Sequence, residues 1–150
     1  MTYPSYTTIR YTKELNTGMN KQMQKPKPHA GLRHVALYTK HLPECVHFYS
    51  ELLGMKLIWQ PDADNYYLSS GSDNLALHRA PANFEPANYQ RLDHIGFFLT
   101  ERDDVDHWHD YLHSNNVEIK ATPKDHRDGT RSFYCADPDG NIIQMIYYPL

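Results

Sequence analysis

The sequence predicts an α+β fold made of two βαβββ modules, at residues 31–80 and 91–148, and three observations lead to this prediction. Two short segments with the same alternation of polar and apolar residues contain His34 and His94, which lie 60 positions apart (94 − 34). A helical pattern follows each segment, and three short strand patterns follow each helix. A unit of about 50 residues cannot bury such a sheet by itself, so the two units are expected to pack together.

The first strand of each module alternates between two faces. In the first module His34 and Tyr38 share one face, and in the second module His94 and Phe98 share the corresponding face. The residues between them are mostly apolar and occupy the opposite face. We therefore expect one face of each strand to contact a helix and the other to carry polar and aromatic side chains.

Helical patterns come next. Pro43 suits the first turn of the first helix, and Gly54 suits its C-terminal end. In the second helix, Val105, Trp108 and Leu112 form an apolar stripe at helical spacing. The histidines of this second helix flank the stripe, so we expect them on a solvated face.

Three short strands are expected after each helix, at residues 56–60, 66–69 and 75–79 and at residues 117–120, 132–135 and 142–148. The last strand follows the sequence Asp-Pro-Asp-Gly-Asn, which is typical of a tight turn because Pro presets one backbone angle and Gly accepts a positive φ. Gln144 interrupts the apolar pattern of this strand. A buried amide needs a partner, so Gln144 marks a functional position.

The sheet faces that the helices leave uncovered would form a shared trough. His34, His94 and Gln144 are expected to point into it, and two imidazoles with one amide oxygen suit a divalent first-row metal ion with open positions for substrate. The alternative is that these groups only hydrogen-bond one another. His78 faces the trough as well, as a fourth ligand, a substrate contact or a histidine at the rim.

Composition argues against several functions. A net charge of −3 and a pI near 6.3 do not favour nucleic acid or an anionic membrane as the main partner. No apolar run in the sequence approaches the ~20 residues of a membrane span. Cys45 and Cys135 lack the CxxC spacing, so reduced, buried thiols in a cytoplasmic protein are expected. Residues 1–30 show neither a helical nor a strand period, and we interpret them as a flexible N-terminal extension.

The segments LRHVALYT, FYSELLGMKL, LDHIGF and FYCADPDGNIIQM together resemble the vicinal oxygen chelate superfamily of glyoxalases, bleomycin- and fosfomycin-resistance proteins and extradiol dioxygenases. The resemblance implies a glyoxalase/dioxygenase-like domain over residues 31–150, with a cup-shaped mixed sheet and helices on its outer face. It also implies a divalent metal ion (Fe, Mn, Zn or Ni) whose ligands match His34, His94 and Gln144. Gln144 departs from the glutamate that is usual in the family and removes one negative charge.

Within the superfamily, the segment DHRDGTRSFYCADPDGN is most similar to the extradiol dioxygenases. Tyr134 lies ten residues before Gln144, as does the tyrosine that contacts catechol in that branch, and His126 is a second candidate for proton transfer. The candidate substrate contacts are Tyr38, Phe98, His78 and Ile142.

Two functions follow as alternatives. The first is a metal-dependent enzyme, either a ring-cleavage dioxygenase or a glyoxalase-type lyase, whose ion binds two neighbouring oxygens of a small-molecule substrate. The dioxygenases carry a histidine just before the fourth strand, where this chain has Ser72-Asp73, so their usual acid–base group is missing. The second is a metal-free protein that sequesters an aromatic compound, as bleomycin-resistance proteins do. A homodimer is the expected assembly.

Overall fold

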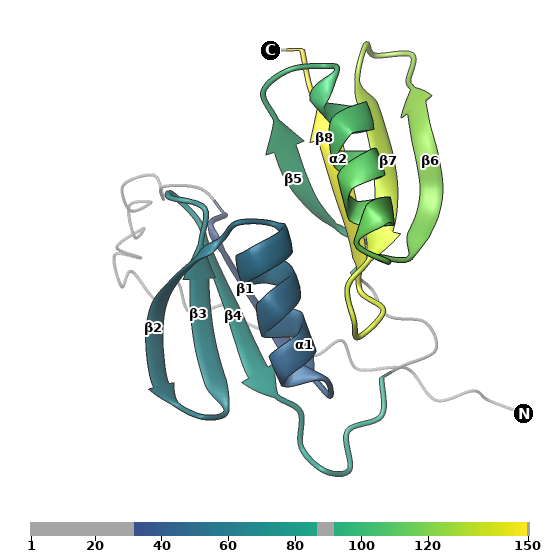
Figure 1. The fold of residues 1–150 in the computed structure, drawn as a ribbon. Helices are drawn as coiled ribbons and strands as arrows, with labels where there is room; N and C mark the ends of the chain where they lie inside the picture. The colour runs from purple at the N-terminus through teal and green to yellow at the C-terminus, as the bar shows by residue number, and fades with distance from the viewer. Residues whose placement is uncertain (1–31, 87–91, 150) are drawn as a thin grey trace, which may run out of the picture. The chain divides into compact units, whose positions relative to one another are not determined.

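The structure is a computed structural model that describes residues 32–86 and 92–149 of the 150-residue chain (Figure 1). The expected extension, residues 1–30, lies outside the described residues. The elements follow in the order β1 (His34–Thr39), α1 (Leu42–His47), the π-helical turn η1 (Phe48–Leu52), β2 (Lys56–Asp62), β3 (Asn65–Ser69), β4 (Asn74–Arg79), β5 (Ile95–Leu99), α2 (Asp104–Ser114), β6 (Ile119–Asp125), β7 (Arg131–Ala136) and β8 (Ile142–Tyr147).

The strands form two four-stranded sheets with the same topology, β1-β4-β3-β2 and β5-β8-β7-β6. In each sheet the first and last strands of the module are parallel neighbours, and the remaining pairs are antiparallel. A parallel pair requires a crossover connection. In each module the helical segment and the two middle strands form this connection. The α+β class and the two βαβββ modules predicted from the sequence are therefore confirmed.

Each helix packs on a sheet of its own module. Helix α2 contacts β6, β7 and β8, and α1 contacts β4 (Figure 1). Val105 and Leu112 of the predicted apolar stripe are fully buried. Of the α2 histidines, His107 and His113 are exposed as expected, but His109 is half-buried and meets the ring of Phe133 edge-on at 5.5 Å. No helix in the described part of the chain is long and apolar enough to cross a membrane.

The first helical segment changes its winding after His47. The N–H of Leu53 donates to the carbonyl oxygen of Phe48, five residues earlier, at 3.0 Å, which is the π-helical pattern. Phe48 and Tyr49 are adjacent in sequence and both buried, so two sides of this turn are packed. Gly54 then follows with φ of +73°, in agreement with the predicted C-terminal glycine.

Strands β2 and β6, each at one edge of its sheet, deviate from the predicted boundaries. β6 was expected at 117–120 but occupies Ile119–Asp125, and β2 extends two residues beyond its predicted end. These strands contain Pro123 and Pro61, which an edge strand tolerates because one row of its N–H groups has no partner strand. Each of these strands shifts its register against the neighbouring strand. The alternation of apolar residues therefore does not show how far the pairing continues.

The tight turn before β8 contacts the first helix. The hydroxyl of Tyr49 donates a hydrogen bond to the Asp137 carboxylate at 2.8 Å. The backbone N–H groups of Lys40 and His41, just before α1, donate to the Asp139 carboxylate at 2.5 and 3.0 Å. The turn therefore satisfies polar groups at the start of a helix in the other module.

Both cysteines lie in the core. Cys45 and Cys135 are 0% exposed and form no disulfide, which confirms the expectation of reduced, buried thiols. Burial, with the Asp137 carboxylate nearby, raises the pKa of the Cys135 thiol to about 12. Burial raises the pKa of the Cys45 thiol as well, and three acidic neighbours add to the effect. Neither thiol is therefore available as a nucleophile in the folded protein.

Candidate metal centre

Gln144 lies in the middle of β8, between Gly96 on β5 and Tyr134 on β7, and is 9% exposed. Its amide nitrogen donates to the hydroxyl of Tyr134 at 2.8 Å and to the hydroxyl of Ser132 at 3.2 Å. The amide oxygen lies 3.7 Å from the point where a Cβ atom on residue 96 would stand. Both amide hydrogens are used, and the oxygen has no hydrogen-bond partner among the described residues, so its lone pairs remain available.

The two candidate histidine ligands are each held through Nδ1. The Nδ1 atom of His34 lies 2.5 Å from Oδ1 of Asn74, its paired residue on β4. The Nδ1 atom of His94 lies 2.5 Å from Oδ1 of Asp93. Both oxygens are acceptors, so Nδ1 carries the hydrogen of each bond, and the neutral form of each ring presents a lone pair on Nε2. Metal-binding histidines are oriented in this way by a partner of the other nitrogen.

Tyr134 contacts the candidate ligands His94 and Gln144 directly, whereas His126 does not. The ring of Tyr134 meets the ring of His94 edge-on at 5.5 Å, and its hydroxyl accepts the hydrogen bond from Gln144. That hydroxyl therefore keeps its own hydrogen to donate. Nε2 of His126 lies 2.9 Å from the hydroxyl of Ser132, so His126 reaches Gln144 only through Ser132. The structure thus brings His94, Tyr134 and Gln144 together and connects His126 to Gln144 through Ser132.

His34 and His94 line one hollow with a volume of about 580 Å³. Asn74 and Gly96 also line it, whereas Gln144 is not among its lining residues. In the described ranges no three His, Cys, Asp or Glu side chains are grouped as metal ligands. Within these ranges, the two histidines therefore have no third donor of these residue types grouped with them.

The register shows which residue of the first module corresponds to Gln144. Gln144 pairs with Tyr134 across β7 and β8, and the equivalent pair in the first module is Ala76 with Tyr67. Ala76 has no ligand atom. His78 lies two residues further along β4, so it is not the counterpart of Gln144.

His78 also lies away from His34. It pairs with Tyr38, which is four residues along β1 from His34. Four residues of a strand span about 13 Å, whereas the nitrogens of two ligands on one ion lie within about 4 Å. This separation favours His78 as a substrate contact over a fourth ligand.

The other predicted substrate contacts lie on or beside the uncovered faces. Tyr38 is 57% and Phe98 is 73% exposed. Tyr38 packs against Phe84 at 5.7 Å between ring centroids, and Phe98 packs against Tyr148 at 6.2 Å. Ile142 is half-buried at the first position of β8.

Residues that orient the candidate ligands were not predicted from the sequence. Asn74 lies 40 positions from His34, and only the pairing of β1 with β4 brings the two together. Ser132 likewise meets Gln144 only through the pairing of β7 with β8. Asp93 directly precedes His94 in the segment LDH, so adjacency in the sequence is a signal that could have identified it.

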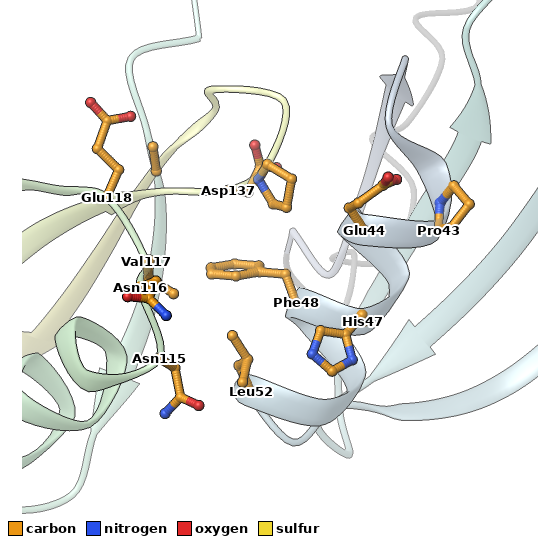
Figure 2. Close-up of a pocket in the computed structure, with 12 residues that line it drawn as sticks. Pro43, Glu44, His47, Phe48, Leu52, Asn115, Asn116, Val117, Glu118 and Asp137 are labelled. Atoms are coloured by element: carbon orange, nitrogen blue, oxygen red, sulfur yellow. The ribbon is translucent and has the colours of Figure 1, made fainter.

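A second hollow, of about 590 Å³, lies between the first helical segment and the second module (Figure 2). Phe48 and Leu52 extend from the helical segment toward Val117. The acidic side chains of Glu44 and Glu118 lie along its border. This hollow is lined by none of the candidate ligands, so we place the functional site on the uncovered sheet faces instead.

The two modules of identical strand order, each with a helix packed on its sheet, define the class of fold. The family model of the Glyoxalase/Bleomycin resistance protein/Dioxygenase superfamily matches residues 31–145, and the chain belongs to this superfamily. The resemblance seen in the sequence is therefore confirmed.

Several relatives are named metallothiol transferase FosB. The protein from Staphylococcus epidermidis is 30% identical over 118 residues, which cover 76% of this chain and 79% of that protein. The protein from Staphylococcus saprophyticus is 27% identical over 116 residues, which cover 76% and 74%.

Solved structures agree with the fold. The lactoylglutathione lyase from Agrobacterium tumefaciens superposes with a TM-score of 0.65 at 22% identity, over 81% of this chain and 96% of that one. An integron cassette protein from the mobile metagenome of a Halifax Harbour sewage outfall gives a TM-score of 0.65 at 26% identity, over 80% and 100%.

Proposed function

We propose that the protein is a metal-dependent enzyme that binds a small substrate through two neighbouring oxygen atoms on a divalent ion held by His34, His94 and Gln144. One observation carries the proposal: each of these side chains has its other polar atom in a hydrogen bond, and among the described residues two Nε2 atoms and one amide oxygen have no hydrogen-bond partner. Two imidazoles and one oxygen fit Fe, Mn, Ni or Zn with open positions. A bound ion would supply Lewis acidity that stabilises negative charge on the substrate oxygens.

Tyr134 is the proposed proton donor. Its hydroxyl accepts from Gln144 and its ring lies against His94, so the free hydrogen is next to both proposed ligands. A group in this position donates a proton or a hydrogen bond to a substrate oxygen as negative charge develops there. His126 has a positioning role in this scheme, because it contacts Ser132, which in turn holds the amide.

The reaction we favour is thiol transfer or a lyase-type conversion. The named relatives are a metallothiol transferase and a lactoylglutathione lyase, and neither name refers to ring cleavage. The position that holds a histidine in ring-cleaving members is occupied by Ser72-Asp73. Asp73 already accepts hydrogen bonds from the hydroxyl of Ser69 at 3.1 Å and from the backbone N–H of Ser70 at 2.6 Å. The residues before β4 thus support a turn and offer no acid–base group for ring cleavage.

A second function, metal-free sequestration of an aromatic compound, is favoured by two features. Gln144 is neutral, so the site compensates less of an ion's charge than a carboxylate would. Tyr38 and Phe98 also present exposed rings on which an aromatic ligand would pack.

Metal analysis decides between the two functions. Protein purified without chelator or affinity-tag nickel would be titrated with Mn²⁺, Ni²⁺, Zn²⁺ and Fe²⁺ by calorimetry, beside the His34→Ala variant. One ion per chain that is lost in the variant supports the enzyme. The metal that binds would then be used in assays with an epoxide plus thiol, a thiol hemiacetal and a catechol. Absence of binding for all four metals supports sequestration.

We also propose a homodimer that uses the edge strand β2. Leu57 and Ile58 on this strand are 49% and 55% exposed. An edge strand with unpaired backbone groups and adjacent exposed apolar side chains readily pairs with another chain. Light scattering coupled to size exclusion should show a dimer that dissociates when Ile58 is changed to Lys. A monomeric wild type at micromolar concentration would contradict the proposal.

A further inference from the structure

A chain of hydrogen bonds on the uncovered face of the first sheet fixes the orientation of His78. The amide nitrogen of Asn65 donates to both carboxylate oxygens of Asp62, at 2.7 and 2.9 Å. The amide oxygen of Asn65 therefore faces His78, whose Nδ1 lies 2.6 Å away. That oxygen only accepts, so Nδ1 carries the hydrogen of this bond, and the neutral form of the ring has its lone pair on Nε2. No hydrogen-bond partner of Nε2 occurs among the described residues.

The β2–β3 hairpin holds this arrangement in place. Asp62 and Asn65 are paired across the hairpin, and Asn65 is paired with His78 on β4. The carboxylate of Asp62 also accepts from the backbone N–H of Asp64 at 2.8 Å. The hydrogen bonds from Asp64 and Asn65 keep the pKa of Asp62 below its ordinary value, so the carboxylate stays ionised.

Aromatic rings surround His78. Tyr67 meets it edge-on at 5.8 Å, and Tyr38 lies at 6.3 Å. Trp59 packs on Tyr67 at 4.7 Å, and Phe84 packs beside Tyr38 at 5.7 Å. Tyr38 and Trp59 are each 57% exposed, so parts of both rings remain open to a ligand.

None of these hydrogen bonds includes a proposed metal ligand. His78 pairs with Tyr38, four residues along β1 from His34, which corresponds to about 13 Å. A ligand can therefore contact His78 and the surrounding rings whether or not an ion is bound at His34.

We propose that His78, with the rings of Tyr38, Tyr67 and Trp59, is a binding site for an aromatic ring that carries a hydroxyl group. The ligand's hydroxyl donates to Nε2, and its ring packs against the open aromatic side chains. A buried or half-buried acceptor discriminates strongly between a ligand that donates to it and one that does not. The site therefore selects phenols and aromatic alcohols over plain arenes.

The test uses phenol as the probe and toluene as the matched ligand without a hydroxyl. Because Trp59 and Trp108 are the two tryptophans of the chain, the Trp108→Phe background makes the fluorescence specific to Trp59. Phenol should change this fluorescence saturably, and toluene should bind at least about tenfold more weakly, as the loss of one hydrogen bond to a fixed acceptor implies. His78→Ala and Asn65→Ala should both weaken phenol binding, whereas His107→Ala on α2 should not.

Nitrogen NMR adds a readout that a merely structural role would not change. The Nε2 resonance of His78 should be that of an unprotonated nitrogen and should shift on addition of phenol. Equal affinity for phenol and toluene, or full phenol affinity in both the His78 and Asn65 variants, overturns the proposal. The His34→Ala variant should keep phenol binding, so failure of the metal proposal and failure of this one are distinguishable.

Discussion

Tyr49 on the first helical segment and Asp137 in the last turn are 88 positions apart and form a buried hydrogen bond of 2.8 Å. Asp137 is 4% and Tyr49 is 0% exposed, so the bond is largely shielded from water. The bond joins the two modules of the repeat, and it makes the turn motif a structural contact between modules as well as a connection between strands.

Removing this bond should destabilise the protein. In Tyr49→Phe the shape of the ring is kept, but the Asp137 carboxylate loses one buried donor. We expect the free energy of unfolding to fall by about 1–3 kcal/mol in urea titrations. Tyr38→Phe is the matched control, because Tyr38 is exposed, and it should stay within about 0.5 kcal/mol of wild type. Equal stability of the two variants would show that the bond contributes nothing.

Alkaline pH should reduce the contribution of the Tyr49–Asp137 hydrogen bond to stability. Burial and the Asp137 carboxylate raise the pKa of Tyr49 well above its ordinary value of 10.0. Below pH 10 the hydroxyl is protonated in both the folded and unfolded states, so its contribution is fully present. Above that pH the unfolded tyrosine ionises first, and the stability is lost as pH rises. Wild-type stability should therefore decline more steeply above pH 10 than that of Tyr49→Phe, as measured by urea midpoints.

Changing Gln144 to Glu should strengthen metal binding. The substitution nearly keeps the shape and adds a negative charge beside the ion, so affinity should rise about tenfold, which is ~1.4 kcal/mol. Without metal the variant should be less stable because it buries a carboxylate, although the hydroxyls of Tyr134 and Ser132 can turn to donate to it. Calorimetry and thermal melts measure the two effects. Lack of metal binding by both forms would show that Gln144 is a hydrogen-bonding residue in a metal-free site.

Asn74 should affect metal binding through His34. In Asn74→Ala the Nδ1 atom of His34 loses its acceptor, and loss of such a partner typically lowers metal affinity by about 10- to 100-fold. Asn65→Ala is the matched control on the same sheet face, because Asn65 holds His78 instead of His34. A loss of affinity of the same size in both variants would argue against specific orientation of His34.

The cysteines should be inert in the folded protein. Burial raises the pKa of both thiols, so little thiolate forms and the sulfur atoms are covered. Alkylation with iodoacetamide at neutral pH, followed by mass spectrometry, should label neither Cys45 nor Cys135 until denaturant is added. Rapid labelling of the native protein would show that the core opens locally around them.

Much of the fold was predictable because it depends on local patterns. The alternation around His34 and His94 assigns each residue to a sheet face, since successive side chains of a strand point to opposite sides. Repetition of that alternation after 60 positions indicates two equivalent modules. Gln144 was recognised as a functional candidate for the same reason, because an amide in an apolar strand violates the pattern that its neighbours set.

The sequence by itself therefore determined the two modules, the faces of their strands and the identity of the proposed ligands. The tertiary structure decided which residues contact these side chains: Asn74 lies beside His34, Ser132 and Tyr134 lie beside Gln144, and Asn65 lies beside His78. The physical reason is that the faces follow from the period of a single strand, whereas partners depend on the register between strands. Register is set by packing of the whole sheet and by turns and bulges at its edges, so it is not written in any short segment.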